Sequence, residues 1–325
     1  MNNTQKLVMA LAVISALAAG CGFLQRTIAN ITQAEKDLEE SRVADDYTPS
    51  EEYYIGRGTS SYIVQTFPMA DPDNAKTREQ IKYLNEMGGY IHEASATVPR
   101  DYMKLGKHVV RNEDERRRIR NLVLFKGVQI GLLDTDDVCA FGTTGGFVWI
   151  SRGAINMCRN EDELAALVCH ELGHVMMNHS MDAYRAANKN AILASAVSKS
   201  IFPGDSIGSK FGQMVVGLGE KVITEGFNKD QEFEADHWGT RALAATGYDP
   251  NAMVRLLESV QAYEKANSGK STYLGNHPKV TDRMEKVKQA IKDMIAANEM
   301  PAEFKSMKDP GPAARQGRFE QTFKR

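Results

Sequence analysis

Residues 168–180 read VCHELGHVMMNHS and contain the most informative pattern in the chain. His170 and His174 stand four residues apart with Glu171 between them, in the pattern His-Glu-x-x-His. Four residues of an α-helix advance by about 400°, so both imidazoles lie on one face, one turn apart, and can hold one ion. Zinc suits neutral imidazole and keeps one position open for water, so we predict Glu171 as the acid–base residue beside that water.

A buried helix is expected to carry this motif. Asn160 and Glu163 form a capping-box pattern, and the helical pattern then continues to Ser180. The residues that lead into the motif are apolar, namely Leu164, Ala165, Leu167 and Val168. Two unpaired imidazoles would be costly in such a helix, which favours a metal site over the alternative of two surface histidines.

A catalytic zinc needs a third protein ligand. His179 is a poor candidate, because on a continuous helix it lies about 180° round from His170 and faces away from the metal. A second helix is expected further on, in NKDQEFEADHWGT (228–240), where Glu232 and Asp236 share one face. We predict Glu232 as the third ligand, and Asp236 as the acceptor for the free ring N–H of a ligand histidine. Solvated acidic runs are common, but Phe233, Ala235, Trp238 and Leu243 indicate a partly buried helix.

Composition places the chain among globular proteins and excludes one class of partner. Its 325 residues are 42% hydrophobic, which is enough for a core. The 40 Lys and Arg residues are balanced by 42 Asp and Glu residues, for a net charge of −2. This balance gives no electrostatic reason to expect a nucleic-acid partner.

Hydrophobic periodicity predicts the remaining elements. Helices are expected from about Ser50, at Ala75 to Glu93, Asp230 to Thr246, Pro250 to Asn267 and Val280 to Ala297. FKGVQIGLLD (125–134) alternates as a strand does, and two short extended pieces follow, VCAFG (138–142) and GFVWIS (146–151). The predicted fold class is therefore α+β and predominantly helical, with a small β-sheet beside the motif helix.

The N-terminal region has the pattern of an exported protein. Lys6 precedes an apolar run, 7–20, that is too short to span a bilayer comfortably, so 1–20 is interpreted as a signal peptide. The run ends in small residues directly before Cys21, as in the lipidation sites of bacterial lipoproteins. Residues 21–49 then form a lipid-anchored tether, and Gly22 permits transport to the outer membrane. The alternative is ordinary cleavage after 16–18.

Three further segments lead to open predictions. Residues 190–226 are rich in Ala, Ser and Gly, and form either a mobile insertion over the cleft or a closely packed pair of small-residue helices. Residues 299–325 have little periodicity, so a disordered tail is expected. Cys139, Cys158 and Cys169 are expected to be buried free thiols, although two of them could pair in an oxidising compartment.

Several motifs together resemble metallopeptidase family 48, a family of gluzincins. They are His-Glu-x-x-His, then Glu-x-x-Ala-Asp at 232–236, NHPKVTDRM (276–284), EEYYIGRG (51–58) and AFGTTGGFVWISRGAI (140–155). The resemblance implies a zinc metallopeptidase domain over 50–298 with one zinc ion, and with Glu232 as its ligand. The apolar N-terminus is similar to that of the family's periplasmic lipoprotein branch.

The resemblance also implies roles for two residues near the last helix. The loop that holds His277 can approach the zinc in this family, so His277 is a candidate for a reversible inhibitory fourth ligand. Arg283 matches an arginine that lies near the catalytic centre. The alternative for His277 is that it and Pro278 only begin the final helix, where proline is well tolerated.

The extended segment of residues 146–151 is expected to be the sheet edge that borders the cleft. Its Gly146, Phe147, Val148 and Trp149 would then pair with an unfolded substrate added as a further strand. From the resemblance we expect a zinc endopeptidase of unfolded or misassembled envelope proteins, lipid-anchored in the bacterial periplasm. The alternative is a chaperone for outer-membrane proteins whose proteolysis is latent, in contact with the assembly machinery. A structural lipoprotein with vestigial zinc is the third alternative.

Overall fold

The computed structural model describes residues 47, 49–95, 104–105, 108–109, 126–185, 217–267, 280–297 and 311–324. The chain divides into two compact units, of which one comprises 1–47 and 182–218 and the other 48–181 and 219–325. In the first unit, the rings of Tyr47 and Tyr184 lie edge to face with centroids 5.6 Å apart. Cys21, the predicted signal peptide, residues 190–216 and His277 lie outside the described residues. All that follows concerns the second unit.

Helices dominate the second unit, as predicted. They are α3 (Pro49–Thr66), α4 (Ala75–Ser95), α6 (Arg152–Met157), α7 (Glu161–Met176), α10 (Lys229–Thr246), α11 (Asn251–Ala266), α12 (Val280–Ala296) and α14 (Gly311–Phe319), which η4 (Glu320–Lys324) follows. The strands are β1 (Lys104–Leu105), β2 (His108–Val109), β3 (Gln129–Leu133), β4 (Ala140–Thr143) and β5 (Phe147–Ser151), with the short helix η2 (Thr144–Gly146) between the last two. The α+β, mainly helical fold class is thereby confirmed.

The three longer strands form one sheet in the order β3-β5-β4. β5 runs parallel to β3 and antiparallel to β4, so it is the central strand. The predicted substrate edge of Gly146, Phe147, Val148 and Trp149 is therefore wrong, since Gly146 belongs to η2 and the other three lie in β5. Strand order depends on the long-range pairing of β3 with β5, which leaves no local pattern in the sequence. The edge strands are β3 and β4, and β4 is the edge strand that packs on the motif helix α7.

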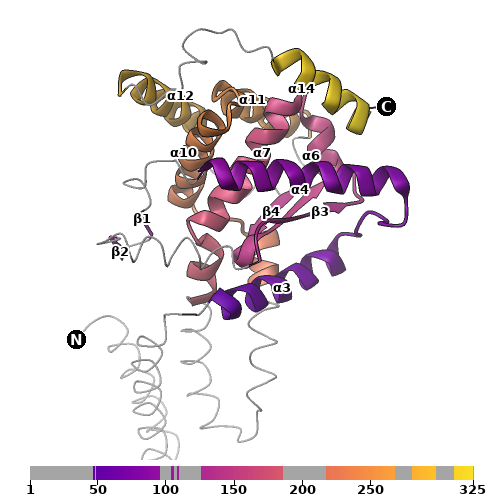
Figure 1. The fold of residues 1–325 in the computed structure, drawn as a ribbon. Helices are drawn as coiled ribbons and strands as arrows, with labels where there is room; N and C mark the ends of the chain where they lie inside the picture. The colour runs from indigo at the N-terminus through magenta and orange to yellow at the C-terminus, as the bar shows by residue number, and fades with distance from the viewer. Residues whose placement is uncertain are drawn as a thin grey trace, which may run out of the picture. The chain divides into compact units, whose positions relative to one another are not determined.

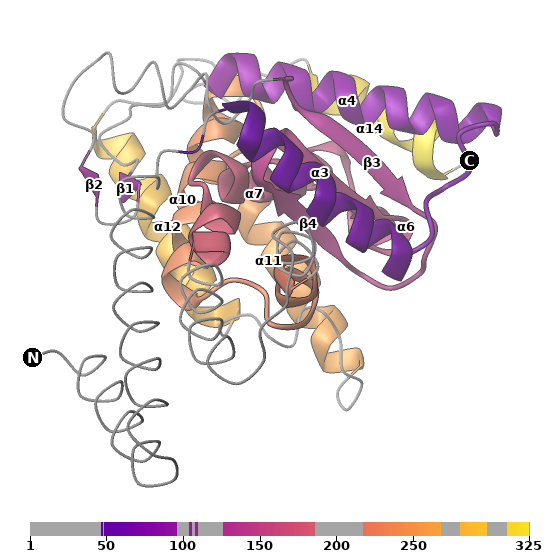
Figure 2. The same cartoon turned by 90° about the horizontal axis from the view of Figure 1, so that it is seen from below.

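Helices surround this sheet (Figure 1; Figure 2). Most of the side chains on its three strands are buried. α4 packs along β3, α3 packs on η2, and α7 packs on β4 and β5. α7 is the centre of the core, because each of its residues except Asp162 is buried. α10 and α11 cover the other sides of α7. The motif helix is thus held on several sides by packed elements.

Two glycines allow α7 and α10 to approach each other closely. A methyl group on Gly173 of α7 would come within 2.8 Å of the Cα atom of Ala235 in α10. A methyl group on Gly239 of α10 would come within 3.2 Å of the backbone of Cys169 in α7. An added methyl group would therefore collide with backbone at Gly173 and be tightly packed against backbone at Gly239.

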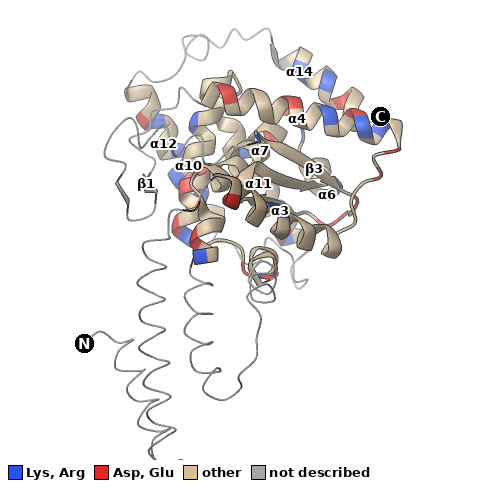
Figure 3. Ribbon diagram, turned by 60° about the horizontal axis from the view of Figure 1, so that its bottom comes forward, with Lys and Arg blue, Asp and Glu red and all other residues tan. Residues whose placement is uncertain are grey.

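The C-terminal segment differs from the disordered tail that the sequence predicts, because residues 311–324 are helical. Phe319 is fully buried in the core, and Arg315 and Arg318 of α14 reach the acidic first turn of α7. Figure 3 shows the basic residues on α14, whereas β3 carries no charged residue. Short helices of this kind are stabilised by tertiary packing rather than by their own periodicity, which explains why the pattern missed them.

The end of the predicted insertion also packs against the body of the unit. Residues 219–224 are helical, Val222 is buried, and a methyl group on Gly219 would meet the ring of Tyr62 in α3. Whether 190–226 is a mobile insertion or a close-packed helix pair stays a prediction. None of the helices in the described ranges is both long and apolar enough to cross a membrane.

Cys139, Cys158 and Cys169 are buried free thiols, as the default prediction states. Burial raises the pKa of each of these thiols. Thiolates are the reactive form of cysteine, so this environment makes all three unreactive at neutral pH.

Candidate metal centre

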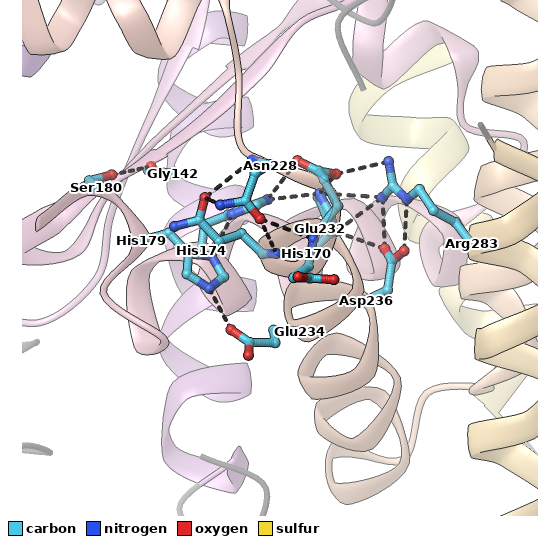
Figure 4. Close-up of polar contacts among 12 residues, drawn as sticks. Gly142, His170, His174, His179, Ser180, Asn228, Glu232, Glu234, Asp236 and Arg283 are labelled. Carbon is cyan, nitrogen blue, oxygen red and sulfur yellow. Dashed lines mark hydrogen bonds and ion pairs between the residues drawn. The ribbon is translucent and has the colours of Figure 1, made fainter. Parts of the chain in front are cut away.

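Three buried side chains from two helices converge on one point (Figure 4). The Nε2 atoms of His170 and His174 lie 3.1 Å apart. The carboxylate of Glu232 approaches both, with Oε2 3.5 Å from Nε2 of His170 and Oε1 3.5 Å from Nε2 of His174. These residues form the metal-ligand cluster among the described part of the chain, so the predicted ligand set of His170, His174 and Glu232 is confirmed.

The donor set fits zinc. Two neutral imidazole nitrogens and one carboxylate oxygen are a recurrent ligand set of catalytic zinc sites, which keep a further position open. Glu232 is fully buried, and an isolated carboxylate would be very costly at such a place. A divalent cation between the three groups offsets that cost.

Local sequence places Glu232 in the first turn of α10. Asn228 caps this helix through bonds from the backbone N–H groups of Asp230 and Gln231, and the Gln231 side chain returns to the Asn228 backbone. The carboxylate of Glu232 thereby lies close to the positive end of the helix dipole. Together with the glycine contacts between α7 and α10, this cap brings the third ligand to the histidine pair.

His170 is oriented by a buried charge pair behind it. Its Nδ1 atom lies 2.9 Å from Oδ1 of Asp236, and Arg283 donates two bonds of 2.7 Å to the same carboxylate. Arg283 also lies 3.0 Å from Oε2 of Glu232. Asp236 therefore holds the ring N–H of His170, and Arg283 balances the charge of both carboxylates.

The pKa values follow from these contacts. Burial lowers the pKa of His170, but its bonds to Asp236 and Glu232 outweigh burial and raise the pKa to about 10. Burial raises the pKa of Asp236, but the neighbouring Arg283 guanidinium and His170 hold it below its usual range. The carboxylate behind His170 is thus kept ionised, which makes the imidazole a better metal donor.

The motif helix ends earlier than the sequence predicts. α7 stops at Met176, and Asn178 adopts a left-handed backbone with φ of 58°. Asn tolerates this conformation better than most residues, so the pair Met177-Asn178 was a usable signal for a helix end. The Asn178 side chain bonds to Glu52 of α3 at 3.1 Å. Because the chain turns here, residues beyond 178 do not follow the helical spacing.

His179 is consequently close to the centre, although it is not a ligand. Its Nδ1 atom lies 2.9 Å from Nδ1 of His174, and its Nε2 atom lies 3.1 Å from Oε2 of Glu234. The ring of Phe227 stacks on His174 with centroids 4.0 Å apart. Sequence reasoning missed these contacts of His179, Glu234 and Phe227, because it assumed a continuous helix.

Glu171 lies between the ligand histidines in sequence and beside β4 in space. It is buried, and a methyl group on Gly142 of β4 would come within 3.3 Å of its Oε2 atom. The predicted acid–base residue is thus next to the edge strand. Ser180 donates a bond of 3.2 Å to the backbone oxygen of Gly142, which ties the end of the motif segment to the same strand.

Comparison with known proteins gives a consistent result. The sequence profile described as Peptidase family M48 matches residues 121–291. The chain is 28% identical over 163 residues to metalloprotease LoiP of Escherichia coli K12, an alignment that covers 50% of this chain and 60% of LoiP. It is 23% identical over 298 residues to metalloprotease YcaL of the same strain, covering 91% of this chain and 99% of YcaL.

Two further relatives are matched over a smaller part of their length. The beta-barrel assembly-enhancing protease of Escherichia coli O157:H7 is 27% identical over 169 residues, which is 50% of this chain and 34% of that protein. The mitochondrial metalloendopeptidase OMA1 of Schizosaccharomyces pombe is 31% identical over 150 residues, 46% of this chain and 42% of OMA1. Except with YcaL, these alignments span less than two thirds of the relative.

The profile match covers α7 and α10, the two helices that supply the ligands. A matching profile and a preformed set of two histidines and a glutamate are independent observations, and they agree. The chain belongs to Peptidase family M48, and His170, His174 and Glu232 form its zinc site.

Proposed function

We propose that the protein is a zinc endopeptidase that cleaves unfolded or misassembled proteins of the bacterial envelope. The observation that carries this proposal is the position of Glu171, which shares the helix α7 with the ligand pair and whose carboxylate lies beside the edge strand β4. A peptide laid along β4 would therefore reach the metal and the base together.

The reaction follows from this arrangement. A zinc ion held by His170, His174 and Glu232 would supply a Lewis acid that polarises the scissile carbonyl and acidifies a water molecule. Glu171 takes a proton from the attacking water and delivers it to the departing amine nitrogen. The buried helix α7 holds Glu171 in place before substrate arrives, so little reorganisation is needed.

The outer edge of β4 is suited to bind extended polypeptide. The N–H of Ser151 donates to the oxygen of Cys139 at 3.0 Å, so the antiparallel alternation directs the peptide groups of Phe141 and Thr143 to β5 as well. Those of Ala140 and Gly142 then face outward, and the Gly142 oxygen already accepts from the Ser180 hydroxyl at 3.2 Å. A substrate strand would pair with the remaining groups through its main chain alone, which favours unstructured chains with loose sequence preference.

The location of the enzyme is proposed from the sequence. Cleavage before Cys21 and lipidation of this residue would anchor the domain 50–298 to a membrane through the tether, with the outer membrane as destination. Substrates in the periplasm would then diffuse to an enzyme fixed at the envelope. His277 remains a candidate for an inhibitory fourth ligand, and it lies outside the described residues.

The match to the beta-barrel assembly-enhancing protease favours a second candidate. In that case the chain assists the assembly of outer-membrane proteins, and its proteolysis is latent. Binding of client proteins would then be independent of Glu171. The two functions can be separated, because only the first requires the acid–base residue.

The test is casein digestion by the full chain and by two variants, with zinc measured in each. Glu171→Gln should retain one zinc per chain but lose cleavage by about 10²- to 10⁴-fold, because the proton carrier is gone. Glu285→Gln, at an exposed position of α12, is the matched control and should cleave like the parent. Chelator should stop cleavage by the parent.

Two results would contradict the proposal. One is a Glu171→Gln variant that digests casein at the parental rate. The other is a zinc-loaded parent protein that does not cleave unfolded substrates. If the Glu171→Gln variant then still supports assembly of client proteins, the assembly function is favoured.

A further inference from the structure

We propose that His179 and Glu234 form a positioning relay for His174, the second metal ligand. In this relay His174 donates its Nδ1–H to Nδ1 of His179, and His179 donates its Nε2–H to Glu234. The relay rests on the metal centre and deepens the proposed function. Its role is to keep the Nε2 lone pair of His174 directed at the ion.

The contacts that define the relay are short and mostly buried. The two Nδ1 atoms are 2.9 Å apart, and Nε2 of His179 is 3.1 Å from Oε2 of Glu234. His174 and His179 are each only 1% exposed. Figure 4 shows Glu234 directed to His179 on the far side of the ring from His174. Phe227 packs on both imidazoles, with centroid distances of 4.0 and 5.7 Å.

Only one assignment of protons satisfies all of these contacts. A histidine that binds metal through Nε2 is neutral and carries its proton on Nδ1. Nδ1 of His174 is therefore the donor, and Nδ1 of His179 must be the acceptor. The proton of neutral His179 then resides on Nε2, where the carboxylate of Glu234 accepts it. Each buried nitrogen has a partner, as buried polar groups require.

The two metal histidines are thus supported in different ways. His170 is held directly by Asp236, which Arg283 pairs with, and both of these residues are buried. His174 is held through a second imidazole, and the chain of bonds ends at Glu234, whose side chain is 35% exposed. The second arrangement extends from the metal centre to the surface of α10.

The break in α7 is what makes this relay possible. On a continuous helix, His179 would lie about 140° round from His174 and could not reach its Nδ1 atom. The left-handed Asn178 re-aims the chain, and two bonds fix the turn, from Asn178 to Glu52 and from Ser180 to Gly142. The turn has local support from α3 and β4, so His179 is positioned before metal binds.

Three substitutions of His179 separate the two halves of the relay. Asn places its Oδ1 atom near the position of Nδ1, so His179→Asn keeps the acceptor for His174 and loses the bond to Glu234. Gln places its amide nitrogen near the position of Nε2, so His179→Gln keeps the donor to Glu234 and loses the acceptor for His174. His179→Phe keeps a ring and loses both bonds.

The measurement is zinc affinity of the full chain at fixed pH, by competition with a chromogenic chelator. Loss of such an outer partner typically weakens metal binding by about 10- to 100-fold, and we expect this for His179→Phe and His179→Gln. His179→Asn should retain most of the affinity. The visible spectrum of the cobalt-substituted protein should change in the same two variants, which a merely structural defect in a remote part would not cause.

His92→Phe is the matched control, since His92 pairs with Glu93 on α4 and should leave zinc affinity unchanged. Parental affinity and an unaltered cobalt spectrum in His179→Phe would overturn the relay. If that variant does not fold, the Asn and Gln variants decide, and equal affinities in these two would also overturn it. Zinc binding is measured without substrate, so a parent that binds zinc but fails to cleave contradicts the proposed function and leaves the relay intact.

Discussion

At the scale of single residues, Asp236 has the most demanding position in the centre. It is 2% exposed and serves two partners, because it accepts from His170 and neutralises Arg283. Arg283 is itself 6% exposed, so its charge depends on neighbouring carboxylates rather than on water. Removal of one member of a buried pair leaves the other charge uncompensated, which costs far more than the pair contributes.

We therefore predict that Asp236→Ala lowers the free energy of unfolding by about 3–5 kcal/mol. Asp236→Asn should cost less, since its amide oxygen can still accept from His170 or Arg283. Urea denaturation of the chelator-treated protein measures both. Asp293→Ala, at an exposed site of α12, is the control and should change little. Equal stability of Asp236→Ala and the parent would show that the pair with Glu232 alone compensates the charge of Arg283.

Residue-level prediction from the sequence worked where the physics was local. The spacing of His170 and His174 follows from helix geometry, and the shared face of Glu232 and Asp236 follows from the same rule. His179 was misplaced for the same reason, because the rule was applied across a helix end. A single backbone angle at Asn178 moved it from the far side of the helix to the ring of His174.

At the scale of elements, the crossing of α7 and α10 assembles the centre. One helix supplies two ligands and the base, the other supplies the third ligand, and the backbones meet at Gly173 and Gly239. A side chain at either position would push the helices apart. Since the ligands project from the same two helices, an increase in spacing would also separate Glu232 from the histidines.

Gly173→Ala should accordingly destabilise the protein by about 1–3 kcal/mol, as overpacking of a core does. It should also weaken zinc binding. Gly89→Ala is the matched control, because Gly89 lies inside α4 with no neighbouring atom within 4 Å of an added methyl group. There the change should instead stabilise the helix by about 0.5–1 kcal/mol. Thermal melts and zinc titration of the two variants test these predictions. Gly173→Ala must lower the stability of the protein and Gly89→Ala must raise it.

The elements themselves were largely predictable, whereas their order in the sheet was not. The expected helices at 75–93, 230–246 and 280–297 lie within two residues of the observed bounds, because their apolar faces repeat with the helical period. The edge strand was misassigned, since alternation shows that a segment is extended but not which strand it pairs with. Nothing in the sequence of residues 128–151 indicates that β5 is the central strand and β4 an edge strand.

At the scale of the whole molecule, the C-terminal segment closes the core around the first turn of α7. Phe319 is fully buried, and Arg318 donates to Glu161 at 2.9 Å, beside the bond from the Tyr248 hydroxyl. Elements far apart in the chain thus meet at one end of the motif helix. No feature within 311–324 alone indicates this docking, which depends on a site built by the rest of the fold.

Phe319→Ala should lower the free energy of unfolding by about 3–5 kcal/mol, because it opens a cavity in a packed core. Ile295→Ala in α12 serves as the control, since Ile295 is 57% exposed. Chemical denaturation followed by circular dichroism measures both variants. A near-neutral Phe319→Ala would mean that the C-terminal helices contribute nothing to the stability of the domain.

The glycine crossing also fixes the spacing of the two helices that carry the metal ligands. Because their backbones are in direct contact, α7 and α10 have little room to slide past each other. A shift of one helical turn would displace a ligand by about 5.4 Å. α7 and α10 are therefore expected to move as one rigid unit. Any adjustment of the surroundings then falls to the elements packed against these two helices, while His170, His174 and Glu232 keep their mutual distances.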